Sequence, residues 1–384
     1  MDDQQKKGAL LLPLAAAALA AITPYTPAHA AEDALAISGF ASLVAGKVLD
    51  GSRSEPYYRY ECPCFIADYG HGALYSKSLT IKQESKVGVQ GTYSFTPALS
   101  ATAQVVGRGV DGVKAGLEWA YLSYDLSPAW TLQVGRKRLP IYYYSDFQDV
   151  GYAYTWVRPP ADIYGWEIVN YNGVNATWRG EWGNWAVKSN LFAGREDTKK
   201  NLMQRLYYET PQDVTWKNIL GGDLVFAREG WTARLTYIQN GVQQWDHDSG
   251  ERVTPEPDSE RNSEKQRIYG FSVNADIGNA FVRSEYSVFD RSSYSYKSHA
   301  WMLGAGYRIG DYTGMLTHSR YDERNRFTPD AIQRDRGWMA TLRYELKGGM
   351  ALKLQVDRFR DVSGADLSYV GHSQLVSVSL DAIF

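Results

Sequence analysis

Most of this chain alternates between apolar and polar side chains, and short turns interrupt the alternation at regular intervals. Residues 376–380 read Val-Ser-Val-Ser-Leu, and residues 99–105 repeat the pattern. Successive side chains of a β-strand point to opposite faces, so each run predicts a strand with one apolar face and one polar face. Counted along the chain to Phe384, the runs predict about sixteen strands and an all-β fold.

The connections between these predicted strands alternate in length. Turns such as Thr96-Pro97-Ala98 and Lys347-Gly348-Gly349 join the two strands of each hairpin, whereas longer and more polar segments join successive hairpins. The long segments are 48–78, 109–115, 139–170, 195–218, 240–266, 290–298, 321–335 and 360–372. An even number of strands, with short turns at one end and long loops at the other, is typical of a transmembrane antiparallel β-barrel.

The polar face of the predicted strands is rich in charge. The basic residues on this face are Lys86, Arg108, Lys137, Arg179, Lys188, Arg234, Arg283, Arg308, Arg343 and Lys353. Charged groups cannot be buried unpaired in an apolar medium, so this face must meet water and the apolar face must meet lipid. The barrel is therefore expected to enclose a water-filled lumen, and sixteen strands make a lumen wide enough for a channel.

The overall composition fits this interpretation and excludes other classes. Mean hydropathy is -0.40, the average of a lipid-facing half and a water-facing half with polar loops added. The formal net charge of -2 lacks the basic excess that a nucleic-acid partner requires. The sequence has no nucleophile elbow, zinc-binding helix or phosphate loop, so we expect neither enzymatic activity nor a cofactor.

The N-terminus has the pattern of an export signal. Two lysines precede an apolar stretch rich in Ala and Leu that is too short to span a bilayer, and Ala28 and Ala30 form a small-residue cleavage site. Residues 1–30 are therefore predicted to be a secretory signal peptide. Residues 31–384 would then form one barrel domain.

Two cysteines, Cys62 and Cys64, flank a proline in the first long connection. A bond across a single residue is strained, but a local disulfide is compatible with an oxidising compartment. A metal site formed with His71 would lack the further ligands that zinc needs, so no metal is expected.

Three segments of the chain resemble the general porins of Gram-negative outer membranes. They are Ile37-Ser38-Gly39-Phe40-Ala41, Gln133-Val134-Gly135-Arg136 and the last ten residues ending in Phe384. The resemblance implies an outer-membrane location, contact with membrane lipid and lipopolysaccharide, and assembly as a homotrimer. It also implies that Phe384 is the signal read by the barrel-assembly machinery.

In that family the third long loop folds into the barrel and narrows the pore. The corresponding segment here, 139–170, is unusually aromatic and lacks a Pro-Glu-Phe-Gly-Gly-like tip, which leaves the geometry of the constriction open. We expect Asp146, Asp149 and Asp162 of this loop to face wall arginines across the pore. The arginines are Arg108, Arg179, Arg283 and Arg343. Opposed charges would create a transverse field that screens solutes. Alternatively, the wall charges pair with one another and the aspartates form turns.

The predicted function is an outer-membrane porin for passive diffusion of ions and small hydrophilic solutes. The acidic third loop favours a slight preference for cations. One alternative is a substrate-selective porin in which the aromatic third loop binds a sugar or another small solute. Another is a barrel that serves mainly as an adhesin or phage receptor through the loops 195–218 and 240–266.

Overall fold

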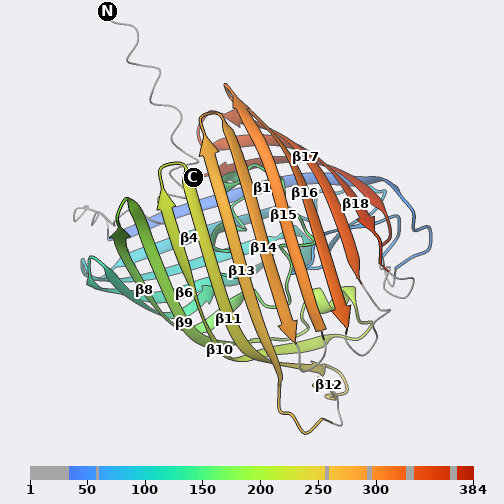
Figure 1. Cartoon of the computed structure of the whole chain (residues 1–384). Helices are drawn as coiled ribbons and strands as arrows, with labels where there is room; N and C mark the ends of the chain where they lie inside the picture. Colours follow the sequence, from blue (N-terminus) through green and yellow to red (C-terminus); the bar gives the residue numbers. More distant parts are fainter. Residues whose placement is uncertain (1–33, 58–59, 256–258, 292–295, 326–332, 364–369) are drawn as a thin grey trace, which may run out of the picture.

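A computed structural model shows a closed antiparallel β-barrel of sixteen strands (Figure 1), and the predicted fold class is confirmed. The structure describes residues 34–57, 60–255, 259–291, 296–325, 333–363 and 370–384. The barrel closes because β1 pairs with both β4 and β19. The predicted signal peptide and its cleavage site at Ala28 and Ala30 lie outside the described residues.

Each barrel strand pairs with its neighbours in chain order. The strands are β1 (Leu35–Gly51), β4 (Lys86–Ser94), β5 (Leu99–Arg108), β6 (Lys114–Ser127), β7 (Trp130–Arg138), β8 (Asn170–Trp182), β9 (Trp185–Thr198), β10 (Gln212–Arg228), β11 (Trp231–Asp246), β13 (Glu264–Ile277), β14 (Ala280–Arg291), β15 (Tyr296–Ile309), β16 (Tyr312–Asn325), β17 (Arg334–Leu346), β18 (Met350–Asp361) and β19 (Ser373–Ile383). A three-residue strand, β12 (Arg252–Thr254), pairs only with the end of β11. Phe384 lies at the seam, where its backbone N–H donates to the carbonyl of Gly39 at 3.0 Å and its carbonyl accepts from the N–H of Gly39 at 2.7 Å.

The strands reach further toward the long loops than the alternation predicted. The expected connection 195–218 is shorter at both ends, because β9 continues to Thr198 and β10 begins at Gln212. The outward residues here are polar, and Arg195 pairs with Asp197 at 2.6 Å on the exposed side of β9. The pattern of apolar and polar faces is lost where both faces of a strand carry polar groups, although the backbone pairing continues.

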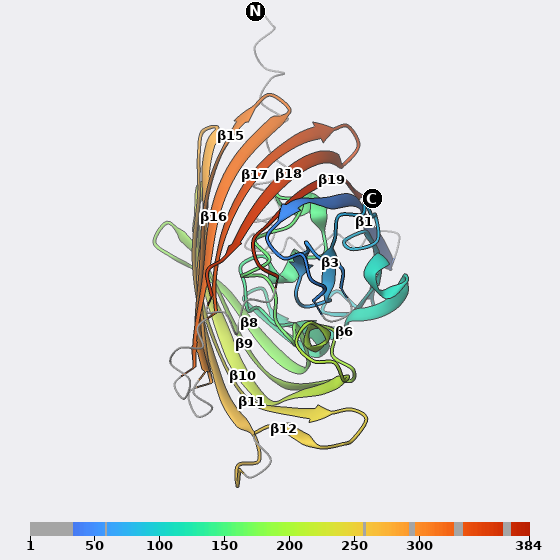
Figure 2. The same ribbon diagram turned by 90° about the vertical axis from the view of Figure 1, so that its right-hand side faces the viewer.

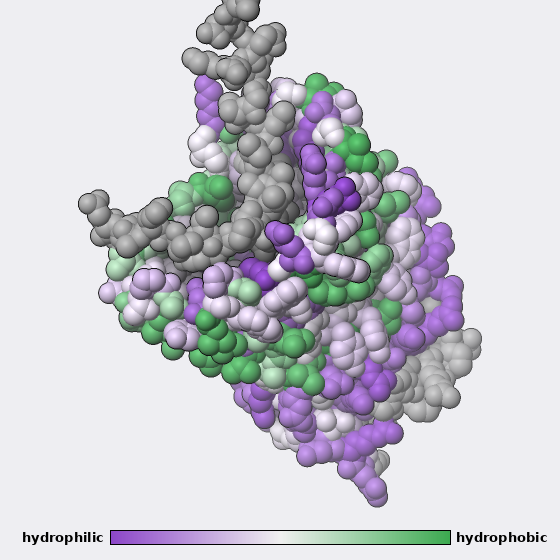
Figure 3. Space-filling view, turned by 60° about the vertical axis from the view of Figure 1, so that its left-hand side comes forward, coloured by the Kyte–Doolittle hydropathy of each residue, from purple (hydrophilic) through white to green (hydrophobic). Residues whose placement is uncertain are grey.

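The outer surface is apolar, as expected. In β18, Leu352, Leu354 and Val356 are exposed whereas the intervening Lys353 and Gln355 are buried. Figure 3 shows hydrophobic side chains gathered across the middle of one face of the barrel, with hydrophilic side chains toward the lower end. Exposed aromatic residues flank the short turns. They include Trp130, Trp182, Trp231, Tyr307 and Tyr312, in the positions where such rings occupy a membrane interface.

Three of the long loops fold inward. Loop 1 (52–85) carries the hairpin β2 (Phe65–Asp68) and β3 (Ala73–Tyr75), and Figure 2 shows β3 lying within the curve of the barrel strands. Loop 3 (139–169) carries the short 3-10 helices η2 (Ser145–Phe147) and η3 (Gly151–Ala153), and loop 4 (199–211) carries η4 (Met203–Leu206). A fourth, η1 (Gly109–Asp111), follows β5. No helix within the described ranges is long and apolar enough to cross a membrane.

The interior of the barrel therefore contains a packed core beside its polar surfaces. Aromatic residues of loop 3 form one buried cluster with inward residues of the wall. The cluster includes Tyr142, Tyr144 and Trp156 from the loop and Ile268, Phe289 and Met302 from the strands. A second cluster joins loop 1 to β1, β18 and β19 and includes Leu206 of loop 4. The inward folding of loops 1 and 4 did not follow from the sequence pattern.

Candidate functional site

Two neighbouring cations hold the middle of loop 3 against the barrel wall. Arg343 of β17 donates to the carbonyl oxygens of Tyr152 and Tyr154, both at 2.7 Å. Lys353, directly opposite on β18, donates to two further carbonyl oxygens of the segment 151–156, at 2.6 and 2.7 Å. Both side chains are fully buried. Because these donors are charged, the bonds are stronger than those between neutral groups, and they fix the loop in the lumen.

A second attachment lies a few residues further along loop 3. The indole N–H of Trp156 donates to the hydroxyl of Thr317 at 2.9 Å. Arg158 lies between Glu84 of loop 1 and Asp357 of β18, at 2.5 and 2.6 Å. Loop 3 is thus attached to loop 1 and to the wall at once, through charges that the sequence analysis did not single out.

Asp149 lies in a buried cluster of charged side chains that come from strands β4 to β7. Its carboxylate accepts from Arg108 at 2.8 Å and also contacts Arg138 and, at 3.7 Å, Lys86. Arg108 also pairs with Glu118 at 2.6 Å. Burial by itself would raise the pKa of the Asp149 carboxyl, but the surrounding cations hold that pKa well below its usual range. The structure therefore brings Asp149 and Arg108 together within a closed ionic cluster.

Asp162 is half-buried in a different place and makes no ion pair within the described part of the chain. Its carboxylate accepts from the hydroxyl of Ser319 at 2.8 Å. Burial raises the pKa of Asp162 to about 6, and the negative charge of Asp357 acts in the same direction. The side chain therefore changes charge between mildly acidic and neutral pH.

This position predicts a pH-dependent loop. A raised carboxyl pKa means that the docked loop favours the neutral form, so docking gains stability as pH falls through about 6. Above that pH the half-buried carboxylate is charged and the described residues pair it with no cation, so docking weakens. We expect the current through single wild-type channels to be noisier at pH 7.5 than at pH 4.5. Asp162→Asn should show the quieter behaviour at both values, and a wild-type current insensitive to pH would contradict this role.

The remaining predicted arginines lie toward the short-turn end. Arg283 pairs with Asp276 at 3.0 Å and Arg308 shares the same carboxylate at 2.6 Å. Arg179 donates to the hydroxyl of Thr131 at 3.0 Å. Of the predicted arginines, Arg108 and Arg343 thus bond to loop 3, whereas Arg179 is hydrogen-bonded to Thr131 and Arg283 is paired with Asp276, both on the wall.

One acidic residue of loop 3 remains exposed. Asp146, on η2, interacts electrostatically with Lys137 of β7, which in turn interacts with Arg179 and Lys188. Arg179 and Lys188 are directly opposite each other on β8 and β9, and both are partly exposed, as is Lys137. We call Lys137, Arg179 and Lys188 the basic wall. The nearby acid Asp223 is buried, accepts from Asn190 at 2.9 Å and lies 3.5 Å from Arg234.

The family of the chain is shown by comparison with known proteins. Residues 15–366 match the family model described as Gram-negative porin. The chain belongs to this family. None of the curated proteins matches it. Membership makes this protein an outer-membrane channel.

Solved porin-like structures share the fold at low sequence identity. OmpF of Salmonella typhi, in complex with daunomycin, has a TM-score of 0.59 at 12% identity, covering 91% of this chain and 97% of that one. The outer-membrane channel DcaP of Acinetobacter baumannii has 0.58 at 10%, with the same coverage. A trimer form of OmpT of Vibrio cholerae has 0.52 at 10%, covering 92% and 100%.

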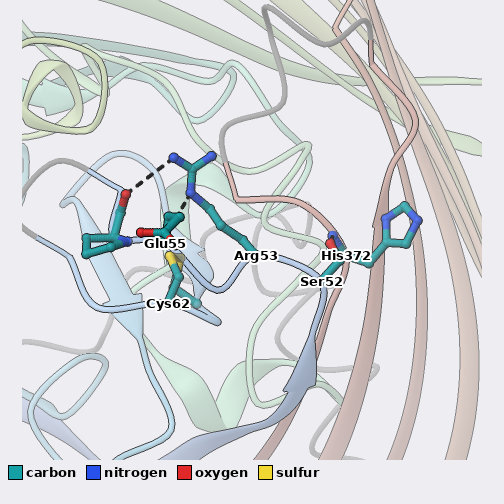
Figure 4. Close-up of a disulfide and its surroundings, with 7 residues drawn as sticks. Ser52, Arg53, Glu55, Cys62 and His372 are labelled. Atoms are coloured by element: carbon teal, nitrogen blue, oxygen red, sulfur yellow. Dashed lines mark hydrogen bonds between the residues drawn. A yellow bond between two sulfur atoms is a disulfide. The ribbon is translucent and has the colours of Figure 1, made fainter.

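Loop 1 of this porin carries the two cysteines, which form a disulfide in the structure. Figure 4 shows Arg53 beside this bond, where its guanidinium donates to the backbone carbonyls of Glu55 and Pro56 at 3.2 and 3.3 Å. The described residues include no group of three or more His, Cys, Asp or Glu side chains that could hold a metal.

The disulfide gives a direct chemical prediction. The intact mass of the purified porin should rise by two hydrogen atoms on reduction, because each sulfur gains one. Alkylation under denaturing conditions should label Cys62 and Cys64 only after reduction. Labelling of both residues in unreduced protein would show that the thiols are free.

Proposed function

We propose that this porin is a water-filled channel for passive diffusion of small hydrophilic solutes, with a preference for anions. The observation that carries the proposal is the basic wall facing Asp146. Asp146 is exposed and the three cations are partly exposed, whereas Asp149 is buried and Asp162 is half-buried. The three cations outnumber the one carboxylate that faces them and give this part of the lumen a positive field, which attracts anions.

This proposal differs from the slight preference for cations that the acidic loop suggested. That expectation counted three aspartates as free charges in the pore. Asp149 is neutralised by Arg108 and Arg138, and Asp162 lies against Ser319. Because Asp149 is paired and buried, it contributes little to the field that a passing ion meets, and the three cations of the basic wall outnumber Asp146 and Asp162.

The packing of the aromatic residues of loop 3 favours passive diffusion and argues against a sugar-binding track. Tyr142, Tyr144 and Trp156 are at most 5% exposed. Tyr144 and Trp156 meet edge to face with ring centroids 5.5 Å apart. A ring that packs inside a core has no free face on which a sugar could stack, so these side chains support the loop.

Export and assembly belong to the same proposal. A signal peptide over residues 1–30 would deliver the chain, and Phe384 at the barrel seam would be read by the assembly machinery. We infer a homotrimer in the membrane, supported by the trimer form of the similar Vibrio cholerae structure.

Conductance in planar bilayers tests the diffusion proposal. Without a binding site in the lumen, current through single channels should rise in proportion to salt concentration, and sugars should not block it at millimolar levels. Saturating, sugar-blockable current would favour the substrate-selective alternative. Purified protein that forms no pores would favour the adhesin or receptor alternative.

A further inference from the structure

We propose that a cavity between loop 1 and loop 3 is a second selectivity site of the channel, which admits small inorganic anions and in which His71 sets the charge. Lys86 and Arg108 line this cavity and are directly opposite each other where β4 and β5 meet the long loops. We therefore call it the outer cavity. The inference rests on the proposed channel and adds to it a site that is separate from the basic wall.

The outer cavity is small and rich in charge. Its volume is about 50 Å³, and one water molecule needs about 10–15 Å³. A chloride ion with a few water molecules fits, whereas a larger anion reaches only the mouth. The charged and titratable side chains that line the cavity from loop 1, the barrel wall and loop 3 include Asp68, His71, Glu84, Lys86, Arg108 and Arg158.

One of the lining cations is available to an anion. Arg108 is bonded to two carboxylates, and so is Arg158. Lys86 has only two long contacts with the described residues, one with the carbonyl oxygen of Gln148 at 3.4 Å and one with Asp149 at 3.7 Å. A lysine ammonium carries three N–H donors. Lys86 can therefore donate to an anion in the outer cavity.

His71 is the group whose charge varies. Its Nδ1 lies 2.7 Å from the carboxylate of Asp68, which also accepts from the backbone N–H of His71 at 3.1 Å. Burial by itself would raise the pKa of Asp68, but the interactions with His71, Lys86 and Arg108 lower that pKa to about 2. Asp68 therefore stays ionised between pH 5 and 8, the range in which imidazole side chains change charge.

The groups around His71 decide what this change does. Tyr154 and Tyr164 of loop 3 line the same cavity and stay neutral, because burial raises the pKa of both well above its ordinary value. The other charged groups that line the cavity or interact with His71 are three carboxylates and three cations, namely Asp68, Glu84, Asp149, Lys86, Arg108 and Arg158. Their formal charges cancel, so protonation of His71 gives the outer cavity a net positive charge, which favours an anion.

The outer cavity and the basic wall adjoin one short segment of loop 3. Asp146 of this segment interacts with Lys137 of the basic wall, whereas Gln148 lines the outer cavity and accepts from Lys86. An ion that passes the loop from the long-loop side would meet the outer cavity before it reaches the basic wall. Charge at the two places acts on the same ion, so the outer cavity adds to the anion preference of the channel.

Reversal potentials in potassium chloride gradients at pH 5.5 and pH 8 test the proposal. All proteins carry Asp162→Asn, so that this carboxyl, whose pKa is about 6, adds nothing to the difference. With His71 present, the ratio of chloride to potassium permeability should be roughly fivefold higher at pH 5.5, the factor expected of one unit charge about 4 Å away in water. His71→Gln should remove this difference, and gluconate in place of chloride should reduce it.

The matched control is His247→Gln. His247 also lies beside an aspartate, with its Nδ1 2.8 Å from Asp213, but it follows β11 and does not line the outer cavity. This variant should keep the full difference between the two pH values. A difference that persists in His71→Gln would overturn the role of His71, and an equal difference with gluconate would overturn the assignment to small anions.

A cysteine in the outer cavity reports on its charge without any current. Val110 lines the cavity and is partly exposed, and the two native cysteines form a disulfide. In Val110→Cys, the rates of modification by an anionic and by a cationic methanethiosulfonate should be compared, because their ratio cancels the effect of pH on the thiol. The ratio of anionic to cationic rate should rise roughly fivefold or more from pH 8 to pH 5.5, and His71→Gln should abolish the rise.

The two measurements separate this site from the proposed channel. A preference for cations at pH 8, or a protein that forms no pores, would contradict the channel proposal. The cysteine rates decide the role of His71 in either case. A ratio of rates that is equal at both pH values, or that rises equally in His71→Gln, would overturn the outer cavity as a site whose charge His71 sets.

Discussion

Replacing Lys353 by Met and Asp381 by Asn is expected to increase the current that each channel carries. The ammonium of Lys353 donates to two carbonyl groups of loop 3 and lies 3.0 Å from Asp381. Each hydrogen bond from a charged donor contributes roughly 1.5–3 kcal/mol. Loss of both should therefore shift the docking of loop 3 by about a hundredfold or more toward release, and the released loop would narrow the lumen less.

The second substitution, Asp381→Asn, is included so that the variant has no buried unpaired carboxylate. Without it, Lys353→Met would leave the Asp381 carboxylate buried without its cation, and misfolding could mask the effect on the loop. Asp381→Asn retains groups that bond the hydroxyls of Ser42 and Ser379. Lys114→Met, at an exposed position, is the matched control. A folded double variant with unchanged conductance would show that loop 3 does not limit the pore.

Reversal of the basic wall should have the largest effect on selectivity. The variant Lys137→Glu, Arg179→Glu, Lys188→Glu is expected to prefer cations. One unit charge acts on an ion 4 Å away with about 1 kcal/mol in water, so reversing three should change the ratio of anion to cation permeability by roughly tenfold or more after screening. The measurement is the reversal potential across a bilayer that separates two salt concentrations.

The control for this variant carries the same charge change on the outside of the barrel. Lys47→Glu, Lys265→Glu, Lys297→Glu alters three exposed lysines on outward faces. Its permeability ratio should stay close to the wild-type ratio, because the lysines are separated from the lumen by the wall. A comparable shift in both variants would mean that overall charge, and not the basic wall, determines selectivity.

The barrel itself could be predicted from the sequence because its signal is local. Alternation within a strand depends on the two faces that its neighbouring residues meet, and the apolar residues of β18 from Leu352 to Val356 show it without reference to any other strand. The aromatic character of the segment 139–170 likewise indicated that the loop needs a surface to pack on. The buried cluster formed by Tyr144 and Trp156 supplies that surface.

The partners of the site residues could not be predicted in this way. Arg158 lies 74 residues from Glu84 and 199 residues from Asp357, yet it contacts both. Such contacts depend on where loops 1 and 3 cross in the lumen, and no local pattern encodes this. Sequence reasoning selected acids and bases on the correct faces. It did not distinguish Asp149, which is closed in an ion cluster, from Asp146, which remains exposed.

The reversal potential of the wild-type channel tests the central claim most directly. A planar bilayer would separate concentrated from dilute potassium chloride, and the zero-current voltage would be read from single channels. The basic wall predicts the sign at which chloride carries most of the current. A reversal potential of the opposite sign, with potassium as the main carrier, would contradict an anion-preferring pore built on Lys137, Arg179 and Lys188.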